Sequence, residues 1–327
     1  ELLLDAGQST VEGFRLAGGR GSTTTREGVI VGGGLAIVGG APTVRRNLIE
    51  DNDIVEAHGL EAAEEALGAG IFAYRADLLL EANVIRNNRS GRGAVATSDG
   101  EVRIVGNAIV DNLAIGDHGA GLYLAGPSIE VRGNLVAGNR LEPHREEGGW
   151  GGGIMVFDQG TVARLRQNVV TDNFAPELGS GVFVDDGASA TLQNELIVAN
   201  RCGFGGSGLY VDGLDEEVIS SALVLNTTIA AHPCEGEGQG LYLERAELTI
   251  GDSIVWDNGG DDLYADELSS IEASYTLSEE SIDGTGNLVA DPLFADAAGG
   301  DFHLRSVAGR WDPLQRQWFD DEAHSPA

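Results

Sequence analysis

Two short patterns of apolar and polar positions alternate along the chain. One starts at a glycine and continues with an apolar run, as in Gly121-Leu-Tyr-Leu124. The other frames an apolar stretch with two asparagines five positions apart, as in Asn107-Ala-Ile-Val-Asp-Asn112. Short runs rich in β-branched and aromatic residues that alternate at period two are typical of strands. Both patterns therefore predict short β-strands, and hardly any stretch shows the helical period.

The asparagine pattern recurs ten times if weaker copies are included, with steps of 21 to 36 residues between copies. Self-similarity at such a period, with spacers of variable length, indicates a solenoid. A further short strand is expected before each asparagine pattern, as in residues 128–132. Glycine and asparagine tolerate the left-handed backbone angles of tight corners. Three short strands per repeat with such corners predict an all-β fold, a parallel β-helix of about ten coils. The one helix expected is a short one at residues 61–67.

The asparagines have a structural explanation of their own. Successive coils of a parallel β-helix lie about 4.8 Å apart, the spacing of strands within a sheet. Equivalent asparagine side chains at that spacing can pass amide hydrogen bonds from one coil to the next. The pattern therefore predicts an asparagine ladder, and any function is expected on the strand that follows the glycines.

These patterns resemble those of right-handed parallel β-helix proteins of the pectate-lyase-like superfamily. The tail, with Asn287-Leu-Val-Ala-Asp-Pro-Leu-Phe294 and Gly300-Asp-Phe-His-Leu304, resembles the end of bacterial surface proteins with a choice-of-anchor C-terminal region. The resemblance implies right-handed coils, as does the crossover rule. It also implies coils over residues 1–286, a truncated capping segment over residues 287–327, and an extracellular or cell-surface location on a bacterium.

The charge of the chain excludes one class of partner. The net charge is −32, and all 20 basic residues are arginines. Without a basic patch to neutralise phosphates, nucleic acid is not expected as a partner. No apolar run is long enough to span a membrane. An anionic surface suits calcium-rich surroundings or cationic partners.

The two cysteines occupy equivalent positions on neighbouring coils. Cys202 follows Asn200 by two residues, and Cys234 follows His232 by two. One coil of separation suits the Cα distance of a disulfide, about 4.4–6.8 Å. We therefore predict a Cys202–Cys234 disulfide and an oxidising compartment. The alternative is a pair of reduced cysteines stacked in the turn.

The second residue after each glycine forms an aromatic-rich column. If its neighbours face the core, this column faces outward, and a row of flat rings suits the faces of sugar rings. The alternative is an aromatic ladder that stabilises the sheet beneath covering loops. The column comprises Ala36, Phe72, Val95, Tyr123, Met155, Phe183, Tyr210, Tyr242 and Tyr264, of which the six aromatic residues are candidate carbohydrate- or partner-binding residues.

Two residues further along each strand lies a second outward column, which is acidic on four successive coils. It contains Asp185, Asp212, Glu244 and Asp266, preceded by positions such as Thr97. These four carboxylates are candidate calcium ligands, since calcium prefers oxygen donors. Alternatively Asp185, Asp212 and Glu244 are candidate catalytic groups for glycoside hydrolysis. The plainest reading is a solvated acidic edge.

The resemblance implies that lyases of this superfamily use calcium with an arginine or lysine base, and hydrolases use clustered aspartates with a nearby histidine. Neither signature transfers cleanly to this chain. We therefore expect a secreted or surface-attached rod without catalysis, which binds polysaccharide or a surface protein through the aromatic sheet. One alternative is a polysaccharide lyase or glycoside hydrolase acting on the same face. The other is a structural protein that self-associates end to end or side by side.

Overall fold

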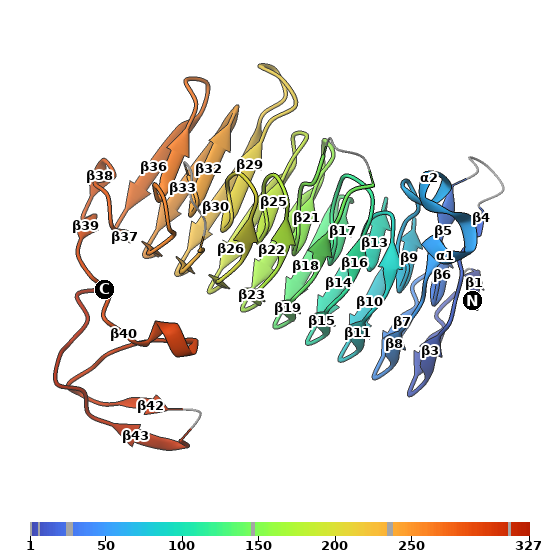
Figure 1. Ribbon diagram of the computed structural model, residues 1–327, viewed down its shortest axis with the longest axis horizontal. Helices are drawn as coiled ribbons and strands as arrows, with labels where there is room; N and C mark the ends of the chain where they lie inside the picture. Colours follow the sequence, from blue (N-terminus) through green and yellow to red (C-terminus); the bar gives the residue numbers. More distant parts are fainter. Residues whose placement is uncertain (1, 6, 24–28, 145–147, 234–237, 313–314) are drawn as a thin grey trace.

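The computed structural model describes the whole chain except residues 1, 6, 24–28, 145–147, 234–237 and 313–314. Figure 1 shows an elongated stack of coils, with the two termini at opposite ends of the rod. The glycine pattern forms sheet A, whose strands are all parallel. In stacking order these are β1 (Leu2–Asp5), β6 (Leu35–Val38), β9 (Ile71–Tyr74), β13 (Val95–Ser98), β17 (Leu122–Leu124), β21 (Ile154–Val156), β25 (Val182–Val184), β29 (Leu209–Asp212), β32 (Leu241–Glu244) and β35 (Leu263–Ala265).

Each coil continues into sheet B and then sheet C. Sheet B stacks β2 (Thr10–Glu12), β7 (Thr43–Arg45), β10 (Leu78–Glu81), β14 (Glu101–Val105), β18 (Ser128–Arg132), β22 (Val162–Arg166), β26 (Ser189–Gln193), β30 (Ser220–Leu225), β33 (Ala246–Gly251), β36 (Ser270–Ser274) and β38 (Gly284–Thr285). Sheet C stacks β3 (Arg15–Ala17), β8 (Leu48–Glu50), β11 (Val84–Arg86), β15 (Ala108–Val110), β19 (Leu135–Ala137), β23 (Val169–Thr171), β27 (Leu196–Val198), β31 (Thr228–Ala230), β34 (Ile254–Trp256), β37 (Leu277–Ser278) and β39 (Leu288–Val289). Three parallel sheets of ten or eleven described strands confirm the predicted right-handed parallel β-helix.

A fourth, shorter sheet was not predicted. It follows the second asparagine of five successive coils and is called the corner sheet below. Its strands are β12 (Arg89–Ser90), β16 (Leu113–Ala114), β20 (Arg140–Leu141), β24 (Phe174–Ala175) and β28 (Arg201–Cys202). Two-residue strands are too short to show any alternation, which explains why the sequence pattern did not indicate them.

The remaining elements decorate the rod. The spacer after β8 forms α1 (Ile54–His58) and α2 (Leu60–Ala63), so the expected helix at 61–67 is displaced toward the N-terminus. Neither described helix is long and apolar enough to cross a membrane. Antiparallel pairs are formed by β4 (Ser22–Thr23) with β5 (Ile30–Val31), β40 (Phe294–Asp296) with β41 (Asp301–Leu304), which enclose η1 (Ala297–Gly299), and β42 (Arg310–Asp312) with β43 (Gln317–Phe319). The parallel coils extend to Val289, and a domain boundary at residue 286 stays a prediction.

The core consists of aliphatic side chains that stack in columns along the rod. In sheet C, for example, Ile49, Ile85, Ile109 and Val136 are paired in register and fully buried. Each such side chain contributes about 1.5–3 kcal/mol on burial. Since every coil buries its apolar face only against its neighbours, stability accumulates from one interface to the next.

Two asparagine ladders run along the corners on either side of sheet C, as predicted. In each, the side-chain Nδ2 of one asparagine donates to the Oδ1 of its equivalent on the next coil. The distance is 2.9 Å from Asn88 to Asn112 and 2.9 Å from Asn112 to Asn139. The same Oδ1 atoms also accept the backbone N–H of the preceding coil. The members are Asn47, Asn83, Asn107, Asn134 and Asn168 in the first ladder, and Asn52, Asn88, Asn112, Asn139, Asn173 and Asn200 in the second.

Two ionisable residues continue these ladders where asparagine is replaced. Glu195 accepts from the Nδ2 of Asn168 at 3.1 Å, and burial raises the pKa of Glu195 to about 8. On the other ladder the Nδ1 of His232 accepts the backbone N–H of Asn200 at 3.0 Å. Complete burial lowers the pKa of His232 to about 3. Both side chains are therefore expected to be uncharged inside the fold at neutral pH.

Replacing Asn112 by Ala should lower the free energy of unfolding by about 3 kcal/mol. The change removes the acceptor of the backbone N–H and Nδ2 of Asn88, and it removes the donor to the Oδ1 of Asn139 and to the buried carbonyl of Ile85. Buried polar groups that lose a hydrogen-bond partner are costly. The measurement is the midpoint of urea denaturation. Gln193→Ala, an amide on the outward side of sheet B, is the control and should change stability by less than about 0.5 kcal/mol. Equal effects of both changes would contradict a stabilising ladder.

Replacing Glu195 by Gln should stabilise the protein at pH 8 and have little effect at pH 4. The folded chain keeps a proton on Glu195 that the unfolded chain releases above its usual pKa of 4.5. Stability of the wild type therefore falls by up to about 1.4 kcal/mol per pH unit as the pH rises through this window, up to about pH 8. Melting temperatures of both proteins from pH 4 to 9 measure the difference. A difference in melting temperature that does not change with pH would contradict the raised pKa of Glu195. Glu272→Gln, on the exposed side of β36, is the matched control for the change of a glutamate to glutamine.

Candidate functional site

The aromatic column lies outside the core, as predicted, but it is covered. Tyr210 is 1% exposed, Phe183 2% and Tyr123 8%. The rings stack on one another, with centroids 4.7 Å apart for Phe183 and Tyr210 and 4.4 Å apart for Tyr242 and Tyr264. The prediction of an exposed aromatic stripe is therefore wrong, because Phe72, Tyr123, Phe183, Tyr210 and Tyr242 are all buried and Tyr264 is half-buried. The alternative of a covered ladder is confirmed.

The cover is supplied by the spacers that lead back into sheet A. They form their own run of single-residue parallel bridges, of which Trp150 pairs with both His118 and Leu178. Trp150 and Leu178 pack against the aromatic cluster, and the guanidinium of Arg92 lies 6.0 Å from the Tyr123 ring. The spacers vary in length, so their return over the sheet is not visible in the repeat pattern. The repeat pattern therefore gave no indication that the aromatic column is covered.

One coil of the aromatic column was also placed out of register. Ala96, rather than Val95, pairs with Phe72 and Tyr123. Val95 is consequently part of the aliphatic core, and Thr97 is buried. The displacement arises because Ala94 takes the position that glycine holds in other coils.

The acidic row forms a hydrogen-bonded network at the end of sheet A. Asp212 and Glu244 are paired in register on β29 and β32. The hydroxyl of Tyr210 donates to Asp212 at 3.2 Å and also to Glu244. The guanidinium of Arg245 forms an ion pair with Asp212, and its backbone N–H donates to Asp266 at 3.2 Å. Tyr210 and Arg245 thus use carboxylate oxygens that a cation would need.

Two members of the row titrate near neutrality. Burial raises the pKa of Asp185 to about 7, and the charges of Asp186 and Asp212 add to the effect. Burial likewise raises the pKa of Asp212 to about 6, although the Arg245 guanidinium opposes the shift. Perturbed carboxyls of this kind occur at catalytic sites and also in structural networks.

A calcium site at the row finds no support in the described part of the chain. No group of three or more His, Cys, Asp or Glu side chains is arranged there to hold a metal ion. The calcium ligands Asp185, Asp212, Glu244 and Asp266 stay a prediction. So does the Cys202–Cys234 disulfide, because Cys234 lies outside the described residues.

A hollow of about 800 Å³ opens instead at the corner between sheet C and the corner sheet. We call it the corner groove. One wall is formed by Arg140, Phe174 and Arg201, which stack on successive coils. The Arg140 guanidinium lies 5.7 Å from the centre of the Phe174 ring, and Arg201 forms an ion pair with Asp172 at 3.2 Å. Sequence reasoning missed these residues, although each directly follows the second asparagine of its coil and that position could have been read as a column.

Small residues create the floor of the corner groove. Ala137 and Gly138 lie between Asp111 on the coil before and Asp172 on the coil after. Gly138 has a positive φ of 66°, and a Cβ there would come within 2.5 Å of an Asp111 carboxylate oxygen. The glycine therefore leaves room between two carboxylates that would otherwise be separated by a side chain.

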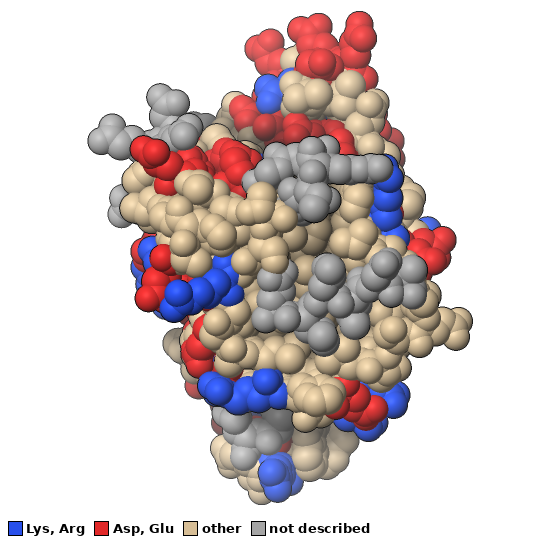
Figure 2. Space-filling view, turned by 90° about the vertical axis from the view of Figure 1, so that its right-hand side faces the viewer, with Lys and Arg blue, Asp and Glu red and all other residues tan. Residues whose placement is uncertain are grey.

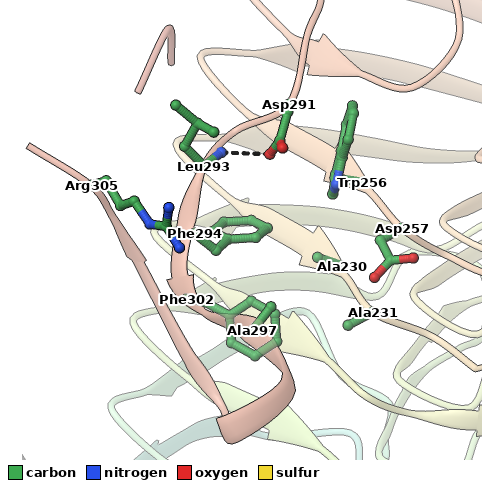
Figure 3. A pocket seen from close by; sticks show the side chains of 10 residues that line it. All are labelled: Ala230, Ala231, Trp256, Asp257, Asp291, Leu293, Phe294, Ala297, Phe302 and Arg305. Carbon is green, nitrogen blue, oxygen red and sulfur yellow. Dashed lines mark hydrogen bonds between the residues drawn. The ribbon is translucent and has the colours of Figure 1, made fainter. Parts of the chain in front are cut away.

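A second hollow, of about 170 Å³, lies between sheet C and the C-terminal hairpin of β40 and β41. Figure 3 shows Trp256, Phe294 and Phe302 around it, with Asp257 at its side. Neither hollow lies over the acidic row of sheet A. The surface charge is mixed: at the N-terminal end of the rod, basic side chains lie beside acidic ones (Figure 2). This end shows no broad basic patch among its described residues.

Comparison with known proteins adds two family matches. Residues 21–213 match the family described as right-handed beta helix region. Residues 216–327 match a family described as disaggregatase related, over about a third of the chain. No curated protein and no solved structure matches. The pectate-lyase-like and choice-of-anchor resemblances are not among these matches. Because the first match covers more than half of the sequence and the sheets have the corresponding architecture, the chain belongs to the right-handed β-helix family.

Proposed function

We propose that this protein is a non-catalytic binding rod, secreted or displayed at the cell surface, that holds a neutral polysaccharide in the corner groove. The observation that carries the proposal is the stack of Arg140, Phe174 and Arg201 beside a floor of small residues. Binding sites combine apolar surface with a few polar groups that fix orientation. The aromatic column of sheet A offers no comparable opening, since its rings are covered.

The chemistry of the corner groove suits a hydroxyl-rich chain. The edge of the Phe174 ring and the floor at Ala137 can pack against the apolar face of a sugar ring. The guanidinium groups of Arg140 and Arg201 donate hydrogen bonds to hydroxyl oxygens, and Asp111 and Asp172 accept hydrogen bonds from hydroxyl groups. The two arginines, like the two aspartates, lie on every second coil, about 10 Å apart. A chain running along the rod therefore meets the same kind of polar group again after two coils.

The charge of the molecule argues for a neutral chain. The net charge is −32, which repels polyanions over long distances. The groove itself offers no surplus positive charge, because Arg140 pairs with Glu142 at 3.1 Å and Arg201 with Asp172. A neutral glycan needs no charge compensation. Its hydroxyl groups can still form hydrogen bonds with both the arginine and the carboxylate of each of these two ion pairs.

Removal of the Phe174 ring should weaken polysaccharide binding at least tenfold. The experiment titrates wild-type protein and Phe174→Ala with neutral glucans, mannans, galactans and xylans by calorimetry. Phe204→Ala is the matched control, since Phe204 is 68% exposed and does not line the groove. Failure of every neutral polysaccharide to bind, or equal binding by Phe174→Ala, would overturn the proposal. Tighter binding of polyanions would overturn its neutral specificity.

A hydrolase is the second candidate, because Asp185 and Asp212 both have pKa values near neutrality. The binding proposal expects no release of reducing ends from any polysaccharide, and it expects Asp212→Asn to bind as the wild type does. Reducing-end assays from pH 4 to 8 test the first point, and calorimetric titration of Asp212→Asn tests the second. Release that is lost in Asp212→Asn would favour the hydrolase and contradict a non-catalytic role.

A further inference from the structure

The cavity beneath the C-terminal hairpin, called the hairpin cavity here, is enclosed by two parts of the chain that are far apart in sequence. One wall comes from the coils, with Ala230, Ala231, Trp256 and Asp257 at the end of β31 and β34. The opposite wall comes from β40, η1 and β41 and from residues that directly precede and follow them, as Figure 3 shows. Its members there are Asp291, Leu293, Phe294, Ala297, Phe302 and Arg305.

On the coil side, the hairpin cavity lies where the large side chain of Trp256 follows the small side chain of Ala230 in one column of sheet C. Trp256 is paired in register with Ala230 on the preceding coil. The indole therefore rises next to a position where only a methyl group covers the strand. On the other side, Phe294 and Phe302 pack edge to face with centroids 5.3 Å apart. These two rings line the hairpin side of the cavity.

The size of the cavity selects a single ring. Its volume is about 170 Å³, and a protein cavity of about 150 Å³ holds one benzene molecule. Indole and phenyl surfaces on two sides favour a flat or flattened ligand with an apolar face.

The polar groups around the space select a ligand with hydroxyl groups. The Arg305 guanidinium donates to the carbonyl of Ala295 at 3.4 Å, and among the described residues no carboxylate lies within ion-pair distance of it. One oxygen of Asp291 accepts the backbone N–H of Leu293 at 2.7 Å, which leaves acceptor capacity on that carboxylate. Asp257 lies exposed at the rim. A purely apolar ring would desolvate these groups without replacing their hydrogen bonds, and two carboxylates against one guanidinium disfavour an anion.

We propose that the hairpin cavity binds one neutral pyranose ring, held between Trp256 and the pair Phe294 and Phe302, with hydroxyl groups directed at Asp257, Asp291 and Arg305. This site goes beyond the corner groove and shares no residue with it. The two sites nevertheless lie along one column of sheet C. The successive register partners in this column are Ala137 at the corner groove, Thr171, Val198, Ala230, and Trp256 at the hairpin cavity.

The test is saturation-transfer NMR and calorimetry of the full chain with methyl glycosides of glucose, galactose, mannose, xylose and N-acetylglucosamine. We expect at least one to bind with a Kd in the millimolar range, and Trp256→Ala to weaken it at least tenfold. Asp257→Asn, which preserves the shape of the side chain, should weaken it measurably and covers the case in which Trp256→Ala does not fold. Trp318→Ala is the matched control, since Trp318 is 70% exposed and lies outside the cavity.

Each outcome decides the proposal. It is overturned if no glycoside of the panel binds, or if Trp256→Ala and Asp257→Asn bind the glycoside as well as the wild type does. It is also overturned if benzoate or phenol binds more tightly than the glycoside and displaces it. Phe174→Ala separates the two sites: it should lose polysaccharide and keep the methyl glycoside. If Phe174→Ala abolishes both, the glycoside occupies the corner groove and the hairpin cavity is not its site.

Discussion

The hydrogen bonds that asparagine side chains pass from coil to coil are the constraint on which the rest of this structure depends. The side-chain amide of a corner residue such as Asn134 bonds to both neighbouring coils. Its Nδ2 donates to the side-chain Oδ1 of Asn168 at 2.9 Å on one side and to the backbone carbonyl of Ile104 on the other. Because both partners lie on adjacent coils, the ladder fixes the register of every strand beside it. The columns along the rod are consequences of that register.

The ladders also tolerate exceptions that introduce a dependence on pH. Glu195 and His232 occupy asparagine positions on adjacent coils, with pKa values shifted in opposite directions by burial. The wild type loses stability from Glu195 as the pH rises above the usual pKa of a glutamate, and from His232 as the pH falls below the usual pKa of a histidine. Between these two values the contributions of Glu195 and His232 to stability change in opposite directions with pH and therefore oppose each other.

The distribution of aromatic rings explains why the proposed binding sites lie on sheet C. On sheet A the rings of Phe183, Tyr210 and Tyr242 stack on one another beneath the spacers, and little of their surface is exposed to solvent. At the corner of sheet C five successive coils continue directly into the corner sheet. Phe174 and Trp256 are consequently left at the borders of hollows rather than beneath a cover.

The sequence by itself determined the repeat, the fold class, the asparagine ladder and the columns, because each depends on contacts between equivalent positions one coil apart. It did not determine which columns are open. Tyr210 and Phe174 are both outward aromatic residues, yet only the path of spacers of unequal length decides that Tyr210 is covered and Phe174 is not. The same holds for Trp256, which becomes part of a cavity only because the hairpin around Phe294 and Phe302 folds back from residues beyond the coils. The local sequence pattern determines where the strands lie and how they pair. The cover over the aromatic column and the hairpin cavity depend on contacts between segments that meet only in the tertiary structure.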